Sequence, residues 1–176
     1  MTRPAVFFDR DGVLNESIVR DNQPFGPLTL DAFRLFDYTA DQVQRLKKAG
    51  YLCIVFTNQP DMARGLLSPL VLAEMHQILQ ADVHLDDLLV CPHLDSDECS
   101  CRKPKPGMIL EAAKKWNIDL RRSFAIGDRW RDIDAGRAAG CKTILIEYSY
   151  SHCKTADFNV SNLIEAVDII LGEKKT

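Results

Sequence analysis

Two aspartates stand two positions apart near the start of the chain, directly after a short apolar run. The run is AVFF (residues 5–8), and Asp9 and Asp11 follow it in the stretch DRDG. Two carboxylates this close to the end of a buried strand repel each other and lose hydration, which is costly unless a cation is bound. Mg²⁺ prefers oxygen ligands and usually binds one or two carboxylates together with a substrate phosphate and water. The pair therefore indicates a magnesium site, with an ordinary Asp-Gly turn as the alternative.

Other residues of the chain could complete such a site. They are Thr57, Asn58, Lys103, Asp128 and Asp132. The hydroxyl, amide and carboxylate groups also have an ordinary explanation, because such groups often cap helices and turns. Carboxylates, a hydroxyl and a lysine that converge on one place are instead typical of phosphoryl transfer. In that chemistry one carboxylate is the nucleophile and cations neutralise the phosphate oxygens.

A second group of potential metal ligands lies in the stretch CPHLDSDECSC. Cys91, His93, Cys99 and Cys101 fall within eleven positions of the chain. Three thiolates and one imidazole match a closed tetrahedral zinc site, which leaves no position open for water. The residues between them offer little apolar surface to bury, so a zinc ion would cross-link a loop that is otherwise mobile. We predict structural Zn²⁺ here, and free or buried thiols are the alternative.

Short apolar runs that are typical of buried strands recur along the chain. They occupy residues 5–8, 52–56, 87–90, 123–126 and 143–147. Helical patterns between and after them occupy residues 39–50, 68–79, 108–116, 132–140 and 161–171. Strands that alternate with helices in this way indicate a parallel sheet covered on both faces. The sequence therefore predicts an open α/β fold, in which ligands bind at the carboxyl ends of the strands.

Three of the helical patterns begin at a recognisable capping residue. Thr39 can cap the first, Ser68 opens the second and Ser161 caps the last. Two segments, residues 15–35 and 92–106, show neither strand nor helix periodicity and are predicted to be irregular. We expect the first of these segments to run over the site as a loop.

The length and composition fit one soluble globular domain, residues 1–176. Hydrophobic residues make up 46% of the chain and charged residues 27%, and the formal net charge is −3. This charge gives no general attraction to nucleic acid or to an anionic membrane, so we expect neither as a partner. The first residues include no long apolar stretch of the kind found in signal peptides and transmembrane helices. We therefore expect a cytoplasmic protein, with a monomer as the default.

Four motifs occur in the order DRDGV, FTNQ, RKPKPGM and IGDRWRDIDAG. In order and spacing they resemble the motifs of the haloacid dehalogenase (HAD) superfamily of phosphohydrolases, and the resemblance covers most of residues 5–150. Within it the chain resembles the capless branch that contains heptose bisphosphate phosphatases and the histidinol-phosphate phosphatase domain. The resemblance implies a three-layer open parallel sheet of Rossmann type with a small zinc-binding loop. The 45-residue gaps between motifs (12–56 and 58–102) leave no room for a large cap domain.

The resemblance also implies a role for each motif residue. Asp9 would be the nucleophile that forms an aspartyl-phosphate, and Asp11 would protonate the leaving oxygen and later activate water. Thr57 and Lys103 would hold the oxygens of the transferring phosphoryl group. The implied Mg²⁺ ligands are Asp9, the backbone carbonyl of Asp11, Asp128 and, as a supporting acid, Asp132. The residues implied to contact the rest of the substrate are Asn58, Arg102 and Arg129.

The implied substrate is a small phosphorylated metabolite. A heptose bisphosphate or a related sugar phosphate is the leading prediction, and histidinol phosphate is the alternative. Two departures bear on this choice: the chain has TNQPD where the heptose enzymes resemble TNQSG, and its segment NESIVRDNQPFGPLTL does not follow their pattern. A hypothesis of another class is an inactive zinc-stapled binding module. The sequence leaves open whether Asp61 and Arg64 touch the substrate, and whether Arg102 and Arg129 are solvated instead.

Overall fold

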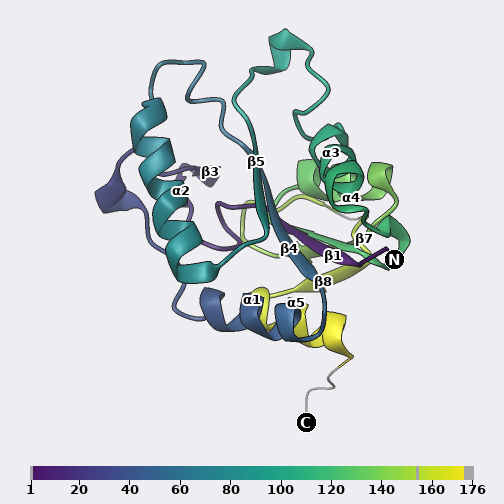
Figure 1. Cartoon of the computed structure of the whole chain (residues 1–176). Helices are drawn as coiled ribbons and strands as arrows, with labels where there is room; N and C mark the ends of the chain where they lie inside the picture. The colour runs from purple at the N-terminus through teal and green to yellow at the C-terminus, as the bar shows by residue number, and fades with distance from the viewer. Residues whose placement is uncertain (1, 154, 173–176) are drawn as a thin grey trace.

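The computed structural model describes residues 2–153 and 155–172. At its centre six parallel strands form one sheet in the order β5-β4-β1-β6-β7-β8 (Figure 1). These strands are β1 (Ala5–Phe8), β4 (Leu52–Asn58), β5 (Asp87–Cys91), β6 (Phe124–Gly127), β7 (Lys142–Ile146) and β8 (Phe158–Val160). The helices are α1 (Thr39–Lys48), α2 (Pro69–Val83), α3 (Gly107–Trp116), α4 (Trp130–Ala139) and α5 (Leu163–Leu171). The predicted open α/β fold with a parallel sheet is confirmed.

Alternation along the central strand divides the core between the two faces of the sheet. Val6 and Phe8 of β1 pack in one buried cluster with side chains of α1, α2 and α5. Ala5 and Phe7 pack in the other cluster with side chains of α3 and α4. Successive strand residues point to opposite faces, so one strand contributes to both clusters. The result is the predicted three-layer arrangement, with the helices of the two clusters on either side of the sheet (Figure 1).

The segment 15–35, predicted to be irregular, contains a short antiparallel hairpin. Its strands are β2 (Ile18–Arg20) and β3 (Gln23–Phe25). Asp21 and Asn22 form the turn with positive φ angles of 49° and 55°, which these two residue types tolerate better than most. The prediction was wrong for these residues because strands of three residues are too short to show a period in the sequence.

Helix starts agree with the sequence in one case and differ in two. Ser68 caps α2, as predicted, by accepting a hydrogen bond from a backbone N–H of the first turn. Thr39 does not cap α1, because its hydroxyl donates to the carbonyl of Leu14 (2.8 Å). The cap of α5 is Asn162 and not Ser161, so that prediction was wrong by one position. Strand β8 was missed because it has three residues, two of them exposed.

The carboxyl ends of β1, β4 and β6 lie side by side at the middle of the sheet. The residue that follows β1 is joined directly to β6, since the amide of Asp9 donates to the carbonyl of Ile126 (2.9 Å). The motifs at residues 9–13, 56–59 and 126–136 therefore meet at one edge, as expected for ligand sites in such sheets. None of the helices in residues 2–153 and 155–172 has the length and apolar character needed to cross a membrane.

Candidate active site

Three buried carboxylates form the centre of the candidate site. Asp9 directly follows β1, Asp128 directly follows β6, and Asp132 lies in the first turn of α4. These residues are 3%, 0% and 2% exposed, and an oxygen of each lies within 4.8 Å of the others. The close packing requires Gly12, whose φ is 84° and whose place has no room for a Cβ beside the Asp128 carboxylate. Three buried negative charges this close together need cations to compensate them.

Lys103 supplies one of these cations. Its Nζ lies 3.0 Å from Asp9 Oδ1 and 2.5 Å from Asp132 Oδ1, and the ammonium group lies 4.3 Å from the centroid of the Phe56 ring. Burial lowers the pKa of the lysine, but Asp132 and Asp9 raise it above its ordinary value, so the amine stays charged. Asn58 fixes the backbone here: its side chain donates to the Lys103 carbonyl (3.2 Å) and accepts from the Lys103 N–H (3.1 Å).

Asp128 is the least compensated of the three acids. Its nearest cationic atom is Arg129 Nε, 3.5 Å from Oδ1, and this oxygen has no hydrogen-bond partner among the described residues. Burial raises the pKa of Asp128 to about 7; Arg129 opposes the shift, and Asp132 and Asp9 add to it. Burial likewise raises the pKa of Asp9 in spite of Lys103. A divalent cation fits among these carboxylates, because it would supply the missing positive charge and prefers oxygen ligands.

Asp11 lies in a polar environment of its own. The Arg10 guanidinium pairs with both oxygens of its carboxylate, while Asn15 and Gln59 each donate one hydrogen bond of 2.9 Å. Burial raises the pKa of Asp11, but Arg10 and these hydrogen bonds lower it more, so the net shift is downward. The Asp11 carboxylate is therefore held ionised outside the three-carboxylate group. Its implied metal contact through the backbone carbonyl stays a prediction.

Two tyrosines from the loop after β7 brace the acidic centre. The Tyr150 hydroxyl donates to Asp128 Oδ2 (2.9 Å), and the Tyr148 hydroxyl donates to the carbonyl of Gly12 (3.0 Å). The two rings stack with centroids 5.1 Å apart. Ser151 also donates, from its hydroxyl to the carbonyl of Asp128 (2.6 Å). This loop therefore links the turn after β1 to the turn after β6 and orients the least compensated acid.

A cavity of about 300 Å³ opens beside the buried acids and Lys103. Asp9, Asp11, Lys103 and Asp132 all contribute to its lining, together with the β3 end of the hairpin at residues 24–26. The positively charged side chains along it are Arg64, Arg102, Lys103, Arg129 and Arg131. A site with ionised acids at one place and several arginines around it suits a phosphorylated ligand, whose oxygens arginine can bind in pairs.

The structure brings most of the predicted residues together and gives two of them other contacts. Thr57 is fully buried, accepts a hydrogen bond from Gln59 (2.9 Å), and does not line the cavity. Arg102 lines the cavity, but its guanidinium is paired with Asp95. Asp61 and Arg64, left open by the sequence, both line the cavity and pair with each other at 2.9 Å.

Sequence reasoning missed several residues of the site. Arg131 stands between Arg129 and Asp132, so its neighbours could have pointed to it, whereas Gln59 belongs to the motif FTNQ, whose amides the sequence already indicated. Tyr150 had no such signal, because its loop reaches the site only through the fold.

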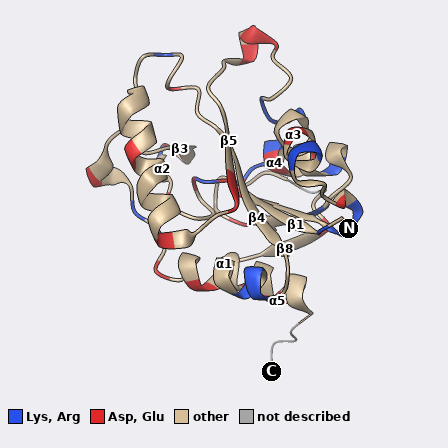
Figure 2. Cartoon of the chain, viewed as in Figure 1, with Lys and Arg blue, Asp and Glu red and all other residues tan. Residues whose placement is uncertain are grey.

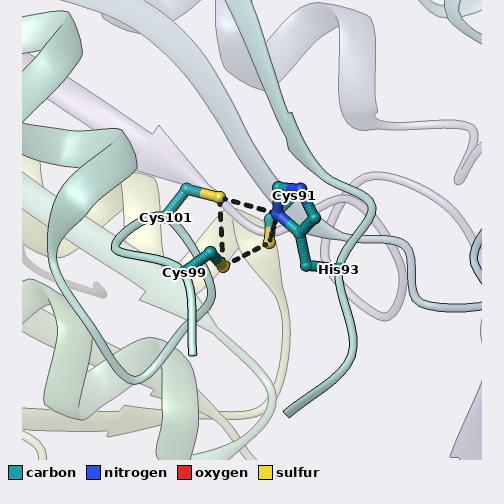
Figure 3. A group of neighbouring side chains, drawn as sticks. All are labelled: Cys91, His93, Cys99 and Cys101. Atoms are coloured by element: carbon teal, nitrogen blue, oxygen red, sulfur yellow. Dashed lines mark hydrogen bonds between the residues drawn. The ribbon is translucent and has the colours of Figure 1, made fainter. Parts of the chain in front are cut away.

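The predicted zinc ligands form a compact group of four side chains (Figure 3). The Cys91 and Cys99 sulfurs lie 3.7 Å apart, and those of Cys99 and Cys101 lie 3.4 Å apart. His93 Nδ1 lies 3.6 Å from the Cys91 sulfur and 3.4 Å from the Cys101 sulfur. Bonds of about 2.3 Å from sulfur to zinc place tetrahedral ligands about 3.8 Å apart. The group therefore fits one tetrahedral metal ion, held between the end of β5 and the returning arm of the loop.

A parallel sheet with paired aspartates after its central strand, a buried lysine and two acids after β6 defines a hydrolase of the HAD-like class. In agreement, the HAD-hydrolase-like family model matches residues 100–159 of the chain.

Relatives of known name cover nearly the whole chain. A D-glycero-beta-D-manno-heptose-1,7-bisphosphate 7-phosphatase from Pasteurella multocida is 39% identical over 98% of this chain and 99% of its own length. A D-glycero-D-manno-heptose-1,7-bisphosphate 7-phosphatase from Thermosynechococcus vestitus is 35% identical over 97% of this chain and 96% of its own. The crystal structure of a D,D-heptose 1,7-bisphosphate phosphatase from B. bronchiseptica, complexed with magnesium and phosphate, superposes with a TM-score of 0.84. It is 27% identical and covers 97% of this chain and 99% of its own.

The chain therefore belongs to the HAD superfamily of phosphatases, in the family of the heptose-1,7-bisphosphate phosphatases. The resemblance drawn from the four motifs is confirmed, as is the enzyme class. The relative whose crystal structure holds magnesium and phosphate has the same fold as this chain.

Proposed function

We propose that this protein is a magnesium-dependent phosphatase that removes the 7-phosphate of D-glycero-D-manno-heptose 1,7-bisphosphate. The observation that carries the proposal is the meeting of Asp9, Lys103, Asp128 and Asp132 beside a cavity rich in arginine. The names of the full-length relatives support the choice of substrate. We further propose that residues 1–176 act as a single domain and that the protein works as a cytoplasmic monomer.

The first chemical step is assigned to Asp9. Its carboxylate attacks phosphorus, the bond from phosphorus to the sugar oxygen breaks, and an aspartyl-phosphate forms. Asp11 gives its proton to the leaving sugar oxygen. Asp11 is ionised beside Arg10 in the structure, and the incoming phosphate dianion raises its pKa by like-charge repulsion. When the substrate binds, Asp11 therefore takes up a proton from solvent, and this is the proton that it gives to the leaving oxygen.

The second step returns the enzyme to its starting state. Asp11, now a carboxylate again, accepts a proton from water, and the resulting hydroxide attacks phosphorus. The bond between phosphorus and Asp9 breaks, and inorganic phosphate leaves. Lys103 holds the phosphoryl oxygens and keeps Asp9 oriented, since its Nζ lies 3.0 Å from the carboxylate. Two carboxylates thus divide one hydrolysis into two easier displacements.

The two metal groups have different proposed tasks. Mg²⁺, held by Asp9, Asp128 and the backbone carbonyl of Asp11 with Asp132 in support, would stabilise the charge that develops on the transferring phosphoryl group. Zn²⁺, held by the Cys91 group, would be structural. All four of its ligands are protein side chains, so the site is closed to substrate.

The substrate assignment rests on the charged side chains of the cavity as well as on the relatives. Four arginines line the cavity besides Lys103, and although five aspartates line it too, arginines that can turn from a carboxylate to a second phosphate favour a bisphosphate over histidinol phosphate. The complete set of acids and lysine likewise argues against an inactive zinc-stapled module, which has no use for buried charges that cost stability.

A substrate panel tests the proposal. Inorganic phosphate release is measured with heptose 1,7-bisphosphate, histidinol phosphate and a generic phosphomonoester, each with and without Mg²⁺. We expect the highest kcat/KM with the heptose bisphosphate and no release without Mg²⁺. A preference for histidinol phosphate would overturn the proposed substrate. No phosphate release from any of the three compounds would refute the proposed phosphatase activity.

A further inference from the structure

Two arginines at the wall of the cavity share one carboxylate of the chain itself. Arg102 donates to both oxygens of Asp95, at 2.8 Å and 3.5 Å, and Arg131 donates to the same oxygens at 2.8 Å and 3.3 Å. All three residues line the cavity. Asp95 lies in the short turn η2 (Asp95–Asp97), at the tip of the loop between Cys91 and Cys101. Figure 2 shows this tip in red, and a blue stretch on the segment that returns from it and carries Arg102. The contact therefore joins the loop tip to the first turn of α4.

The arginine pair is next to the groups that carry out the chemistry. Arg131 Nη1 also donates to the carbonyl of Lys103 (3.3 Å), and Arg131 precedes Asp132 in α4. Arg102 is further fixed by a hydrogen bond from its Nη1 to the carbonyl of His93 (3.0 Å), beside the metal group of the loop. Both guanidinium groups are thus held by backbone contacts that do not depend on the Asp95 carboxylate.

The Asp95 side chain is far more exposed than the two arginines that it pairs with. Its side chain is 65% exposed, whereas that of Arg102 is 11% exposed and that of Arg131 is 32% exposed. Ion pairs with so exposed a carboxylate contribute little free energy. A phosphate dianion carries more charge and three acceptor oxygens, so it makes stronger paired hydrogen bonds with arginine than one carboxylate does.

We propose that Asp95 is a built-in competitor that occupies the Arg102 and Arg131 pair in the free enzyme and gives way to the second phosphate of the substrate. This inference rests on the proposed function, in which the substrate carries two phosphates. Asp95 is then a specificity-determining residue. It keeps the arginines paired when no second phosphate is present and sets how strongly the enzyme prefers a bisphosphate to a monophosphate.

Asp95→Asn tests the competition, because it removes the charge and keeps the shape. The matched control is Glu98→Gln, which removes one negative charge from the same loop at a side chain that does not line the cavity. Binding of heptose 1,7-bisphosphate and of heptose 7-phosphate is measured by calorimetry in magnesium-free buffer, where no turnover is expected. Asp95→Asn should tighten binding of the bisphosphate about twofold to thirtyfold, the range for losing two exposed ion pairs. Binding of the monophosphate by Asp95→Asn should stay unchanged. Binding of both ligands by Glu98→Gln should also stay unchanged.

Every other result counts against the inference. Unchanged or weaker bisphosphate binding by Asp95→Asn would mean that Asp95 only supports the arginines. Equal tightening of both ligands, or the same gain in Glu98→Gln, would mean a general charge effect. If the wild type binds and hydrolyses neither heptose phosphate, the proposed function fails. The competition is then decided by fructose 1,6-bisphosphate against fructose 6-phosphate, with the same outcomes.

Discussion

Replacing Asp128 by asparagine should stabilise the magnesium-free protein at neutral pH. The wild-type carboxylate is fully buried, and its Oδ1 has no hydrogen-bond partner among the described residues. Asparagine has nearly the same shape and can still accept the hydrogen bond from Tyr150. The substitution therefore removes a buried charge without opening a cavity, and the gain in free energy of unfolding should depend on pH.

The magnitude follows from the pKa of Asp128, which burial raises from 3.8 to about 7. The folded protein then binds more protons than the unfolded chain between these values, so wild-type stability falls as pH rises from about 4 to about 7. Each pKa unit corresponds to about 1.4 kcal/mol, which gives a loss of about 4 kcal/mol. Asp128→Asn does not share this loss. Its advantage over wild type should therefore grow by about 4 kcal/mol across the same interval and stay constant above it.

Urea unfolding of both proteins from pH 4 to pH 8, with zinc retained and magnesium absent, measures this difference. Burial lowers the pKa of His76 to about 4, so its contribution to the free energy of unfolding rises with pH. This contribution is the same in both proteins and cancels in their difference. Mg²⁺ at about a hundred times its Kd should return about 2.7 kcal/mol to wild type alone. A difference between the proteins that stays flat from pH 4 to pH 8 would refute the reasoning, as would equal stabilisation of both by Mg²⁺.

Two further predictions concern the supports of the site. Tyr150→Phe removes the hydroxyl that orients Asp128 and should weaken Mg²⁺ binding about tenfold, as measured by calorimetry. The control is Tyr38→Phe, which removes a hydroxyl from a ring that stacks on Phe36 and does not line the cavity; unchanged affinity in Tyr150→Phe would contradict the bracing role. Cys99→Ser should lose zinc, lower the thermal midpoint and raise KM for the substrate, because the metal group holds the arm that carries Lys103. The control is Cys153→Ser, at a free cysteine outside the Cys91 group, and full activity in a folded, zinc-free protein would contradict the structural role.

Much of the fold could be predicted because the parallel strands are short buried runs separated by helices of regular period. The run at residues 5–8 is apolar at every position, as a strand covered on both faces must be. The elements that were missed lack such a signal. Strand β8 has two exposed residues out of three, and the hairpin strands β2 and β3 have no fully buried residue. Nothing in their local sequence separates them from a loop.

In the candidate site too, the residues with a local sequence signal could be predicted and those without one could not. Asp9, Asp128 and Lys103 could be predicted because each stands in a local motif at a strand end or beside the metal ligands. The contact of Tyr150 with Asp128 spans 22 residues, and that of Arg131 with Asp95 spans 36. Both depend on where irregular loops come to rest in the folded chain. Hydrogen bonds of this kind leave no periodic trace in a sequence, so the arginine pair and its carboxylate became visible only in the structure.

The most direct measurement of the central claim is phosphate release from heptose 1,7-bisphosphate by wild type and by Asp9→Asn, side by side. Urea unfolding of the variant serves to show that its fold is intact. We predict magnesium-dependent release by wild type and loss of essentially all release by Asp9→Asn, because the amide cannot form the aspartyl-phosphate. Release by a folded Asp9→Asn protein at a rate near that of wild type would contradict the account.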